Sequence, residues 1–172
     1  APIGVVALVA VWGSARVSAG ELTRAGRALP VALVQGNVAQ NEKWDPRHAP
    51  AILTRYLDLT GEAAARGARL IIWPESSTPF YFESDIREGE RIRALVRRAG
   101  VRLLLGSDQV EPGAPPKYYN AAFMVQPDGG TAAVYRKMHL VPFGEYVPLQ
   151  SLLFFVGSIV ESVSDFTPGE AI

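Results

Sequence analysis

Cysteine is absent from the 172 residues of this chain, and neither sign of charge is in excess. The lack of cysteine excludes disulfides, zinc–thiolate sites and a cysteine nucleophile from these residues. Lys and Arg number 17 and Asp and Glu number 17, so the chain lacks the basic field of a nucleic-acid-binding protein. It also has no phosphate-binding glycine loop and no cluster of metal ligands, so we expect no cofactor. Hydrophobic residues make up 48% of the chain, which is enough for one domain with a sizeable core.

The chain begins at Ala1 rather than Met, with an uncharged apolar run over residues 1–12. That run is shorter than the about 20 residues that span a bilayer, and it lacks the basic start of a signal peptide. Two interpretations are open: the end of a transmembrane helix, or a buried element of a soluble fold. Because Trp12, Gly13 and Ser14 suit a helix end at a membrane interface, we predict that residues 1–14 end a transmembrane helix and residues 15–29 form a linker.

From residue 30 onwards, strand and helix patterns alternate. Short apolar runs predict buried strands at 30–36, 69–75 and 101–107. Apolar residues at helical spacing predict helices at 49–66 and 86–99, which end at Gly67 and Gly100. The turn PDGG between 118–126 and 131–136 predicts a β-hairpin. The order β-α-β-α-β-β-β indicates a layered α/β domain.

Apolar residues are dense after the predicted hairpin. Residues 137–148, KMHLVPFGEYVP, contain two prolines and a glycine and predict a loop. Residues 149–160 are more apolar than a surface helix, and they fit a core helix and a lipid-facing element about equally. We predict that Val141, Phe143, Val147 and the run 152–156 face lipid or an acyl channel.

Three charged residues stand out by position. Glu75 follows an apolar strand, Lys137 sits where the hairpin ends, and Glu145 lies in the apolar loop just after it. Sites of α/β proteins are built at the carboxyl ends of strands. In a poorly hydrated cleft, a carboxylate can take a proton from a nucleophile and an ammonium can stabilise an oxyanion. Each residue alone is more often an ordinary loop or strand-end residue, so the hypothesis of acyl-transfer chemistry depends on the three together.

Four stretches together resemble one known family. LIIWPESSTPF resembles the strand-and-glutamate motif of the nitrilase, or carbon–nitrogen hydrolase, superfamily. YRKMHLVPFGEYVP is similar to its lysine motif, in the form found in apolipoprotein N-acyltransferases. VALVQGNVAQNEKWDP and YYNAAFMVQPDGG are similar to the opening strand and the hairpin of the same domain. The resemblance covers residues 30–172, in order and without large gaps.

The resemblance implies a Glu-Lys-Cys triad on an αββα sandwich, here incomplete and formed by residues 30–172. It makes Glu75 the general base, Lys137 the oxyanion stabiliser and Glu145 the second glutamate, which orients the lysine. Trp44 then lines the acyl or lipoprotein pocket. Asn120, Phe143 and Tyr146 are further candidate substrate-binding residues, although Asn120 and Tyr146 equally fit hairpin and loop packing. The nucleophilic cysteine has no counterpart, and we interpret this as truncation at both ends rather than a broken triad.

The implied reaction transfers an acyl chain in two steps. A cysteine thiolate attacks an acyl ester of a membrane phospholipid, and the amine of a diacylglyceryl-cysteine lipoprotein then takes the chain from the thioester. The resemblance places the domain on the extracytoplasmic side of a bacterial inner membrane. Two alternatives stay open. A soluble amidase uses the same triad with water as the acceptor, and a non-catalytic binding module keeps the fold without the nucleophile.

Overall fold

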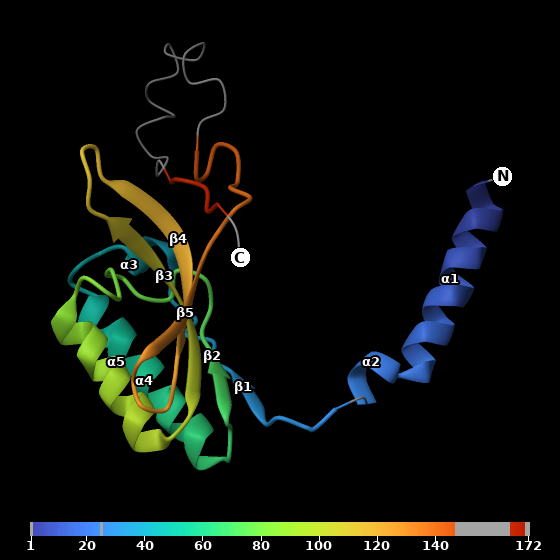
Figure 1. Ribbon diagram of the computed structural model, residues 1–172, viewed down its shortest axis with the longest axis horizontal. Coiled ribbons are helices and arrows are strands. Elements are labelled where there is room, and N and C mark those ends of the chain that lie inside the picture. Colours follow the sequence, from blue (N-terminus) through green and yellow to red (C-terminus); the bar gives the residue numbers. More distant parts are fainter. Residues whose placement is uncertain (1, 25, 147–165, 171–172) are drawn as a thin grey trace, which may run out of the picture.

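The computed structural model describes residues 2–24, 26–146 and 166–170. It begins with an apolar helix, α1 (Pro2–Ala19), followed by the short α2 (Glu21–Arg24). Both lie apart from the α/β layers of the chain (Figure 1). The helix passes through Gly13 and Ser14 and continues to Ala19, so it extends beyond residue 14, where the sequence placed its end. A chain that meets no Pro and no strained turn at Gly13 continues its helical hydrogen bonding.

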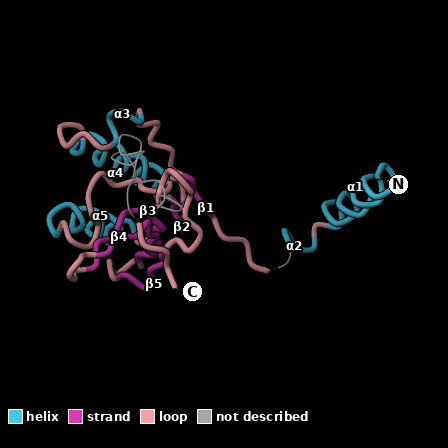
Figure 2. The backbone as a smooth tube through the Cα atoms, turned by 90° about the horizontal axis from the view of Figure 1, so that it is seen from above, coloured by secondary structure: helices cyan, strands magenta, loops and turns pink. Residues whose placement is uncertain are grey.

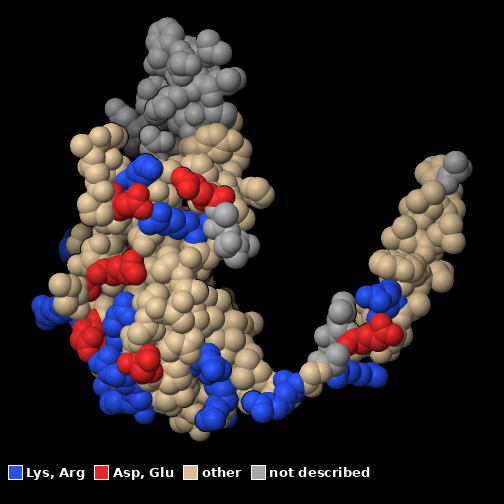
Figure 3. Space-filling view, in the orientation of Figure 1, with Lys and Arg blue, Asp and Glu red and all other residues tan. Residues whose placement is uncertain are grey.

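Helix α1 is, within the described ranges, the one helix long and apolar enough to cross a membrane, judged by length and composition alone. Its 18 residues correspond to about 27 Å, close to the about 30 Å of a bilayer's hydrocarbon core. None of its residues is buried against the rest of the chain. Figure 3 shows the charged side chains of this region gathered where α1 meets α2, and α1 beyond them carries no charge.

A single five-stranded sheet follows, in the order β1-β2-β3-β4-β5. Strands β1 (Val31–Leu33), β2 (Leu70–Ile72) and β3 (Arg102–Glu111) are parallel. Strands β4 (Lys117–Val125) and β5 (Thr131–Arg136) continue the sheet antiparallel to β3 and to each other. The predicted order of strands and the predicted hairpin are therefore confirmed.

The hairpin contains one irregularity in its pairing. Met124 pairs with Ala133, but Val125 pairs with Thr131, so the pairing passes over Ala132. The turn that follows Val125 is closed by the Gln126 amide, which donates to the Gly130 carbonyl at 2.8 Å. Gly129 supplies the positive φ of 84° that this turn requires.

Two longer helices cover one face of the sheet (Figures 1 and 2). They are α4 (Ala49–Ala65) and α5 (Ile86–Ala99), both close to their predicted bounds; the short α3 (Gln40–Lys43) was not predicted. Helix α5 begins where the Asp85 side chain accepts a hydrogen bond from the Glu88 amide and ends at Gly100, whose φ is 64°. The core lies between these helices and the sheet; its fully buried members include Leu53, Ile71, Phe82, Ile92, Val96, Leu103, Leu105 and Phe123.

The opposite face of the sheet carries a row of side chains across four strands. Leu33 pairs with Ile72, Ile72 with Leu104, and Leu104 with Met124. Leu33 is 78% exposed, whereas Val34 and Ile71, on the helix face, are buried. The described residues thus form one helical layer and one sheet of the predicted αββα sandwich, and the polar site lies on this second face.

Candidate active site

Glu75 is presented by a turn that leaves β2 and is anchored at its start by Trp73. The Trp73 amide donates to the Leu104 carbonyl at 2.8 Å, which ties the turn to β3. The Trp73 indole N–H donates to Thr60 Oγ1 at 2.8 Å in the core, and both side chains are buried. A buried indole needs such a partner. The residue two positions before Glu75 is thereby held by β3 and by α4.

The turn lies directly on the backbone of β3 at Gly106. Both the amide and the hydroxyl of Ser77 donate to the Gly106 carbonyl, each at 2.8 Å. A Cβ at position 106 would lie 2.5 Å from the Pro74 carbonyl oxygen and 2.7 Å from Glu75 Cα. Only glycine allows the two backbones to approach this closely. Gly106 therefore determines how near the sheet Glu75 can lie.

Lys137 follows β5 and is held at its backbone by two neighbours. Its amide donates to the Asn120 carbonyl of β4 at 2.8 Å, and its carbonyl accepts from the Gly169 amide at 2.9 Å. Phe166 also returns to the site, because its amide donates to the Glu145 carbonyl at 3.0 Å. The described residues near the end of the chain thus pack along the loop that carries Lys137 and Glu145.

The three predicted charged residues meet at one ammonium group. Lys137 Nζ lies 2.9 Å from Glu75 Oε1 and 2.9 Å from Glu145 Oε1. Asn120 Nδ2 donates to the same two oxygens, at 2.6 Å to Glu75 and 2.9 Å to Glu145. An ammonium and an amide, both donors, thus bridge two carboxylates. Asn120 is 7% exposed, and the structure places it inside the site rather than in hairpin packing alone.

Glu75 and Glu145 differ in whether both carboxylate oxygens accept hydrogen bonds from the described residues. The Glu145 side chain is 14% exposed, and its second oxygen accepts the Val141 amide at 2.8 Å. The Glu75 side chain is 61% exposed, and its Oε2 has no hydrogen-bond partner among the residues that the structure describes. Glu75 is therefore the carboxylate with an oxygen available to a reacting proton. Glu145 is engaged on both oxygens, which suits a residue that holds Lys137 in place.

The surroundings of Lys137 and Glu145 keep both side chains charged. Burial opposes the charge of Lys137, but hydrogen bonds to Glu145 and Glu75 and their negative charges outweigh it and raise its pKa. Burial likewise opposes the charge of Glu145, but hydrogen bonds from the Val141 amide, Lys137 and Asn120 outweigh it and lower its pKa. An ammonium with a raised pKa stays positive at neutral pH, as an oxyanion stabiliser must.

Asp108 is a fourth polar residue of this region that the sequence prediction missed. It lies on β3 opposite Asn120 of β4, and its Oδ1 accepts a hydrogen bond from Ser76 Oγ at 3.0 Å. Burial raises the pKa of Asp108, and the negative charges of Glu145 and Glu75 also raise it. The hydrogen bond from Ser76 and the positive charge of Lys43 act in the opposite direction. The signal in the sequence was a lone acid directly after the predicted strand 101–107.

The predicted substrate-binding residues other than Asn120 surround this centre without bonding to it. Trp44 is 51% exposed at the end of α3, with Lys43 Nζ 5.2 Å from its ring centre. Val141 and Phe143, in the loop before Glu145, are both exposed. Phe143 has a positive φ of 61°. Val147 and the run 152–156 lie outside the described residues, as does the whole of the predicted apolar segment 149–160.

One cavity adjoins the Lys137 ammonium group, and a second is lined by residues that follow Lys137 in the chain. One, of about 380 Å³, is lined by Glu75, Asn120 and Lys137 together with apolar side chains that include Trp73, Leu104 and Tyr135. The other, of about 510 Å³, is lined by Met138, His139, Leu140, Tyr146, Phe166 and Pro168. Tyr146 thus lies on an apolar cavity next to the lysine loop.

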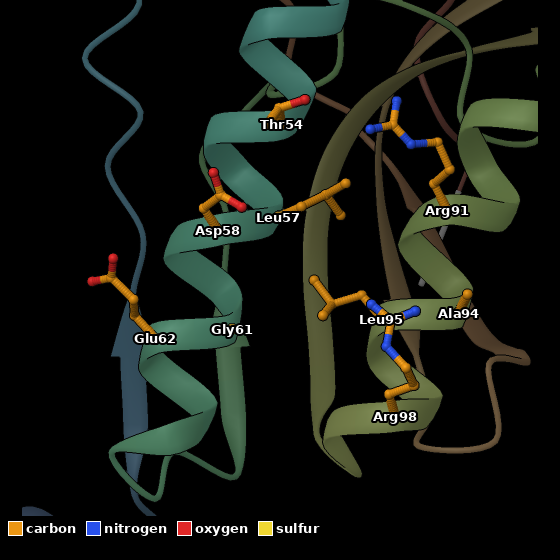
Figure 4. A pocket seen from close by; sticks show the side chains of 9 residues that line it. All are labelled: Thr54, Leu57, Asp58, Gly61, Glu62, Arg91, Ala94, Leu95 and Arg98. Atoms are coloured by element: carbon orange, nitrogen blue, oxygen red, sulfur yellow. The ribbon is translucent and has the colours of Figure 1, made fainter.

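A larger pocket, of about 770 Å³, lies between α4 and α5 (Figure 4). Leu57 of α4 and Leu95 of α5 point toward one another there, and the charged residues Asp58, Glu62, Arg91 and Arg98 also line the pocket. It contains none of the residues around Lys137, so size alone does not locate the chemistry. Over residues 2–24, 26–146 and 166–170, no group of three or more His, Asp or Glu is arranged to hold a metal ion.

The sequence of residues 30–165 matches the profile of the carbon–nitrogen hydrolases. The chain belongs to this family. Curated relatives include the apolipoprotein N-acyltransferases of Geobacter metallireducens, 43% identical over 149 residues, and of Azotobacter vinelandii, 38% identical over 175 residues. These alignments cover 86% and 96% of this chain but 29% and 32% of the relatives. The chain therefore spans about a third of the length of the curated relatives that it matches.

Solved structures of the family share the fold. A carbon–nitrogen hydrolase from Helicobacter pylori matches with a TM-score of 0.55 at 18% identity, over 83% of this chain and 45% of that one. An amidase from a Nesterenkonia species matches with a TM-score of 0.56 at 22% identity, over 88% of this chain and 52% of that one. The predicted nitrilase-like architecture is thus confirmed.

Proposed function

We propose that this chain provides the general base and the oxyanion-stabilising ammonium of an apolipoprotein N-acyltransferase. The observation that carries the proposal is that Glu75 and Glu145 both contact one lysine nitrogen, each at 2.9 Å, beside an apolar cavity. The names of the curated relatives and their similarity over most of this chain support the reaction class. The 172 residues contain no cysteine, so the thiol that carries the acyl chain would come from outside them.

In the first step, Glu75 takes the proton of that thiol through its free oxygen. The thiolate attacks the ester carbonyl of a membrane phospholipid, and Lys137 stabilises the oxyanion of the tetrahedral intermediate. The intermediate collapses to a thioester, and the leaving lysophospholipid oxygen takes the proton from Glu75. In the second step the N-terminal amine of a diacylglyceryl-cysteine lipoprotein attacks the thioester. Glu75 takes the amine proton and returns it to the departing thiolate, so the thiol and Glu75 are restored.

The apolar surroundings of the site fit long-chain substrates. Val141 and Phe143 are exposed on the loop that supplies Glu145, and the cavity at Tyr146 continues this apolar region. Trp44 is exposed beside Lys43, an arrangement that suits a membrane interface. Together with the apolar helix α1, these features support a location at a membrane, and we propose that it is the bacterial inner membrane with the site on its extracytoplasmic side.

The complete reading frame that contains these residues can be expressed in a bacterium depleted of its own N-acyltransferase. We expect mass spectrometry of lipoprotein N-terminal peptides to show the amide-linked acyl chain, and Glu75→Gln to remove it. Unacylated lipoproteins in the presence of membrane-inserted protein would overturn the proposal. Release of ammonia from small amides by the same protein would then favour an amidase, and neither activity would favour a binding module.

A further inference from the structure

Ser76, the residue after Glu75, has an unusual backbone conformation. Its φ is 43°, in the left-handed region that residues with a Cβ rarely adopt. A residue other than glycine is strained in this conformation, and it stays there only with support from the surrounding structure. Because Glu75 and Ser76 share a peptide unit, whatever holds Ser76 also sets the direction in which Glu75 leaves the turn.

The side chain of Ser76 has one described partner. Ser76 Oγ donates to Asp108 Oδ1 at 3.0 Å, and Ser76 is 8% exposed. Two residues later, Thr78 Oγ1 donates to Ser107 Oγ at 2.6 Å, again on β3. The hydroxyls of Ser76 and Thr78 thus both bond to side chains of β3.

We propose that Asp108 is a positioning residue that acts through Ser76 to fix the turn presenting Glu75. This inference rests on the proposed function, in which Glu75 is the base. Asp108 suits the role because it lies within β3, where its backbone is paired with Asn120 on the neighbouring strand. Asn120 in turn donates to Glu75. Asp108 and Asn120 thereby restrain the same glutamate, one through its backbone and the other through its carboxylate.

The proposed role needs an acceptor atom at position 108 and not a negative charge. The Ser76 hydroxyl can donate to a carboxylate and equally to the carbonyl oxygen of a protonated acid or an amide. Burial raises the pKa of Asp108, which is consistent with a group that is not present for its charge. Asparagine at position 108 should therefore preserve the positioning, whereas alanine at 108 or at 76 should remove it.

The test uses the complete reading frame with Ser76→Ala, Asp108→Ala, their double variant, Asp108→Asn and the exposed Ser84→Ala as a control. Shifting a catalytic group by about 1 Å costs up to about 10²-fold in rate. We expect Ser76→Ala and Asp108→Ala to lower kcat within that range, with KM unchanged. The double variant should fall no further than the single ones, and Asp108→Asn and Ser84→Ala should resemble the wild type.

Among the single variants, two results would overturn the proposal: wild-type kcat in Ser76→Ala, or a loss in Asp108→Asn as large as in Asp108→Ala. Multiplied losses in the double variant would do so as well, because they would show that the two residues act separately. If Asp108→Ala fails to accumulate in membranes, Ser76→Ala and Asp108→Asn decide, since neither opens a large cavity.

A second readout separates this inference from the proposed function. Alkylation of the catalytic thiol by iodoacetamide depends on proton removal by Glu75 and requires no lipid substrate. Slower alkylation in Ser76→Ala and Asp108→Ala, with wild-type rates in Asp108→Asn, supports the positioning role even if no lipoprotein is acylated. Unchanged alkylation in Ser76→Ala and Asp108→Ala refutes it even if the enzyme is an N-acyltransferase.

Discussion

Glu75 and Lys137 are 62 positions apart in the sequence, and their side chains meet at 2.9 Å. One comes from the turn after a parallel strand and the other from the end of an antiparallel hairpin. Packing does not explain the position of Glu75, since its side chain is largely exposed. Two oppositely charged groups that line one apolar cavity support the proposed site of chemistry.

Replacing the base should stop the reaction before any acyl group is transferred. We expect Glu75→Gln to lower the acylation rate by at least about 10²-fold, the range of general-base catalysis. The fold should persist, because Gln can still accept hydrogen bonds from Asn120 and Lys137. Single-turnover formation of the thioester measures this loss. A variant that forms the thioester at the wild-type rate would assign the base elsewhere.

Removing the ammonium should affect the transition state. We expect Lys137→Met to lower kcat by about 10²–10³-fold, the typical cost of one oxyanion donor. Lys137→Arg should not restore the rate, because a planar guanidinium cannot take the place of one nitrogen lying 2.9 Å from both glutamates. Steady-state kinetics of the three proteins test this. Near-wild-type activity in Lys137→Arg would show that Lys137 acts through its positive charge alone.

The acid stability of the protein should depend on Glu145. Its pKa is lowered in the folded state, so the stability from its charge is fully present above its unfolded pKa and is lost as the pH falls through the folded pKa. The pKa of Lys137 is raised, so its contribution is lost only as the pH rises through its folded value. We expect the difference in Tm between wild type and Glu145→Gln to be constant near neutral pH and to shrink in acid. A difference that persists through acid pH would contradict this.

Substitution of the glycine that lies under the Glu75 turn should also disturb the site. In Gly106→Ala, the new Cβ would meet Pro74 and Glu75, and overpacking of this kind costs about 1–3 kcal/mol. We expect lower activity together with a lower Tm. Gly61→Ala in α4 is the matched control, because its Cβ would have no neighbour within 4 Å and alanine in a helix stabilises by about 0.5–1 kcal/mol. Equal activity in Gly106→Ala and Gly61→Ala would show that the turn carrying Glu75 tolerates a Cβ at position 106.

The sequence predicted the parts of this molecule that depend on local patterns. The helical spacing of apolar residues in α4 and α5 and the glycine-containing turn of the hairpin can be read directly from the sequence. The motifs around Glu75 and Lys137 pointed to the charged residues that meet in the structure. Asp108 and Ser76 were missed because their contact depends on two things that no local pattern encodes. These are the register of β3 against β4 and the left-handed backbone at Ser76.

The uneven pairing of β4 and β5 has a consequence for how the site is assembled. Residues directly opposite one another on antiparallel strands point to the same face, so the face that Lys137 reaches is set by its place opposite Asn120, whose carbonyl accepts the Lys137 amide. Ala132, over which the pairing passes, is the extra residue of a β-bulge between Val125–Thr131 and Met124–Ala133. Lys137 thus takes its direction from β4 and not from the length of β5: deleting Ala132 should make the ladder regular and leave the ammonium facing both glutamates.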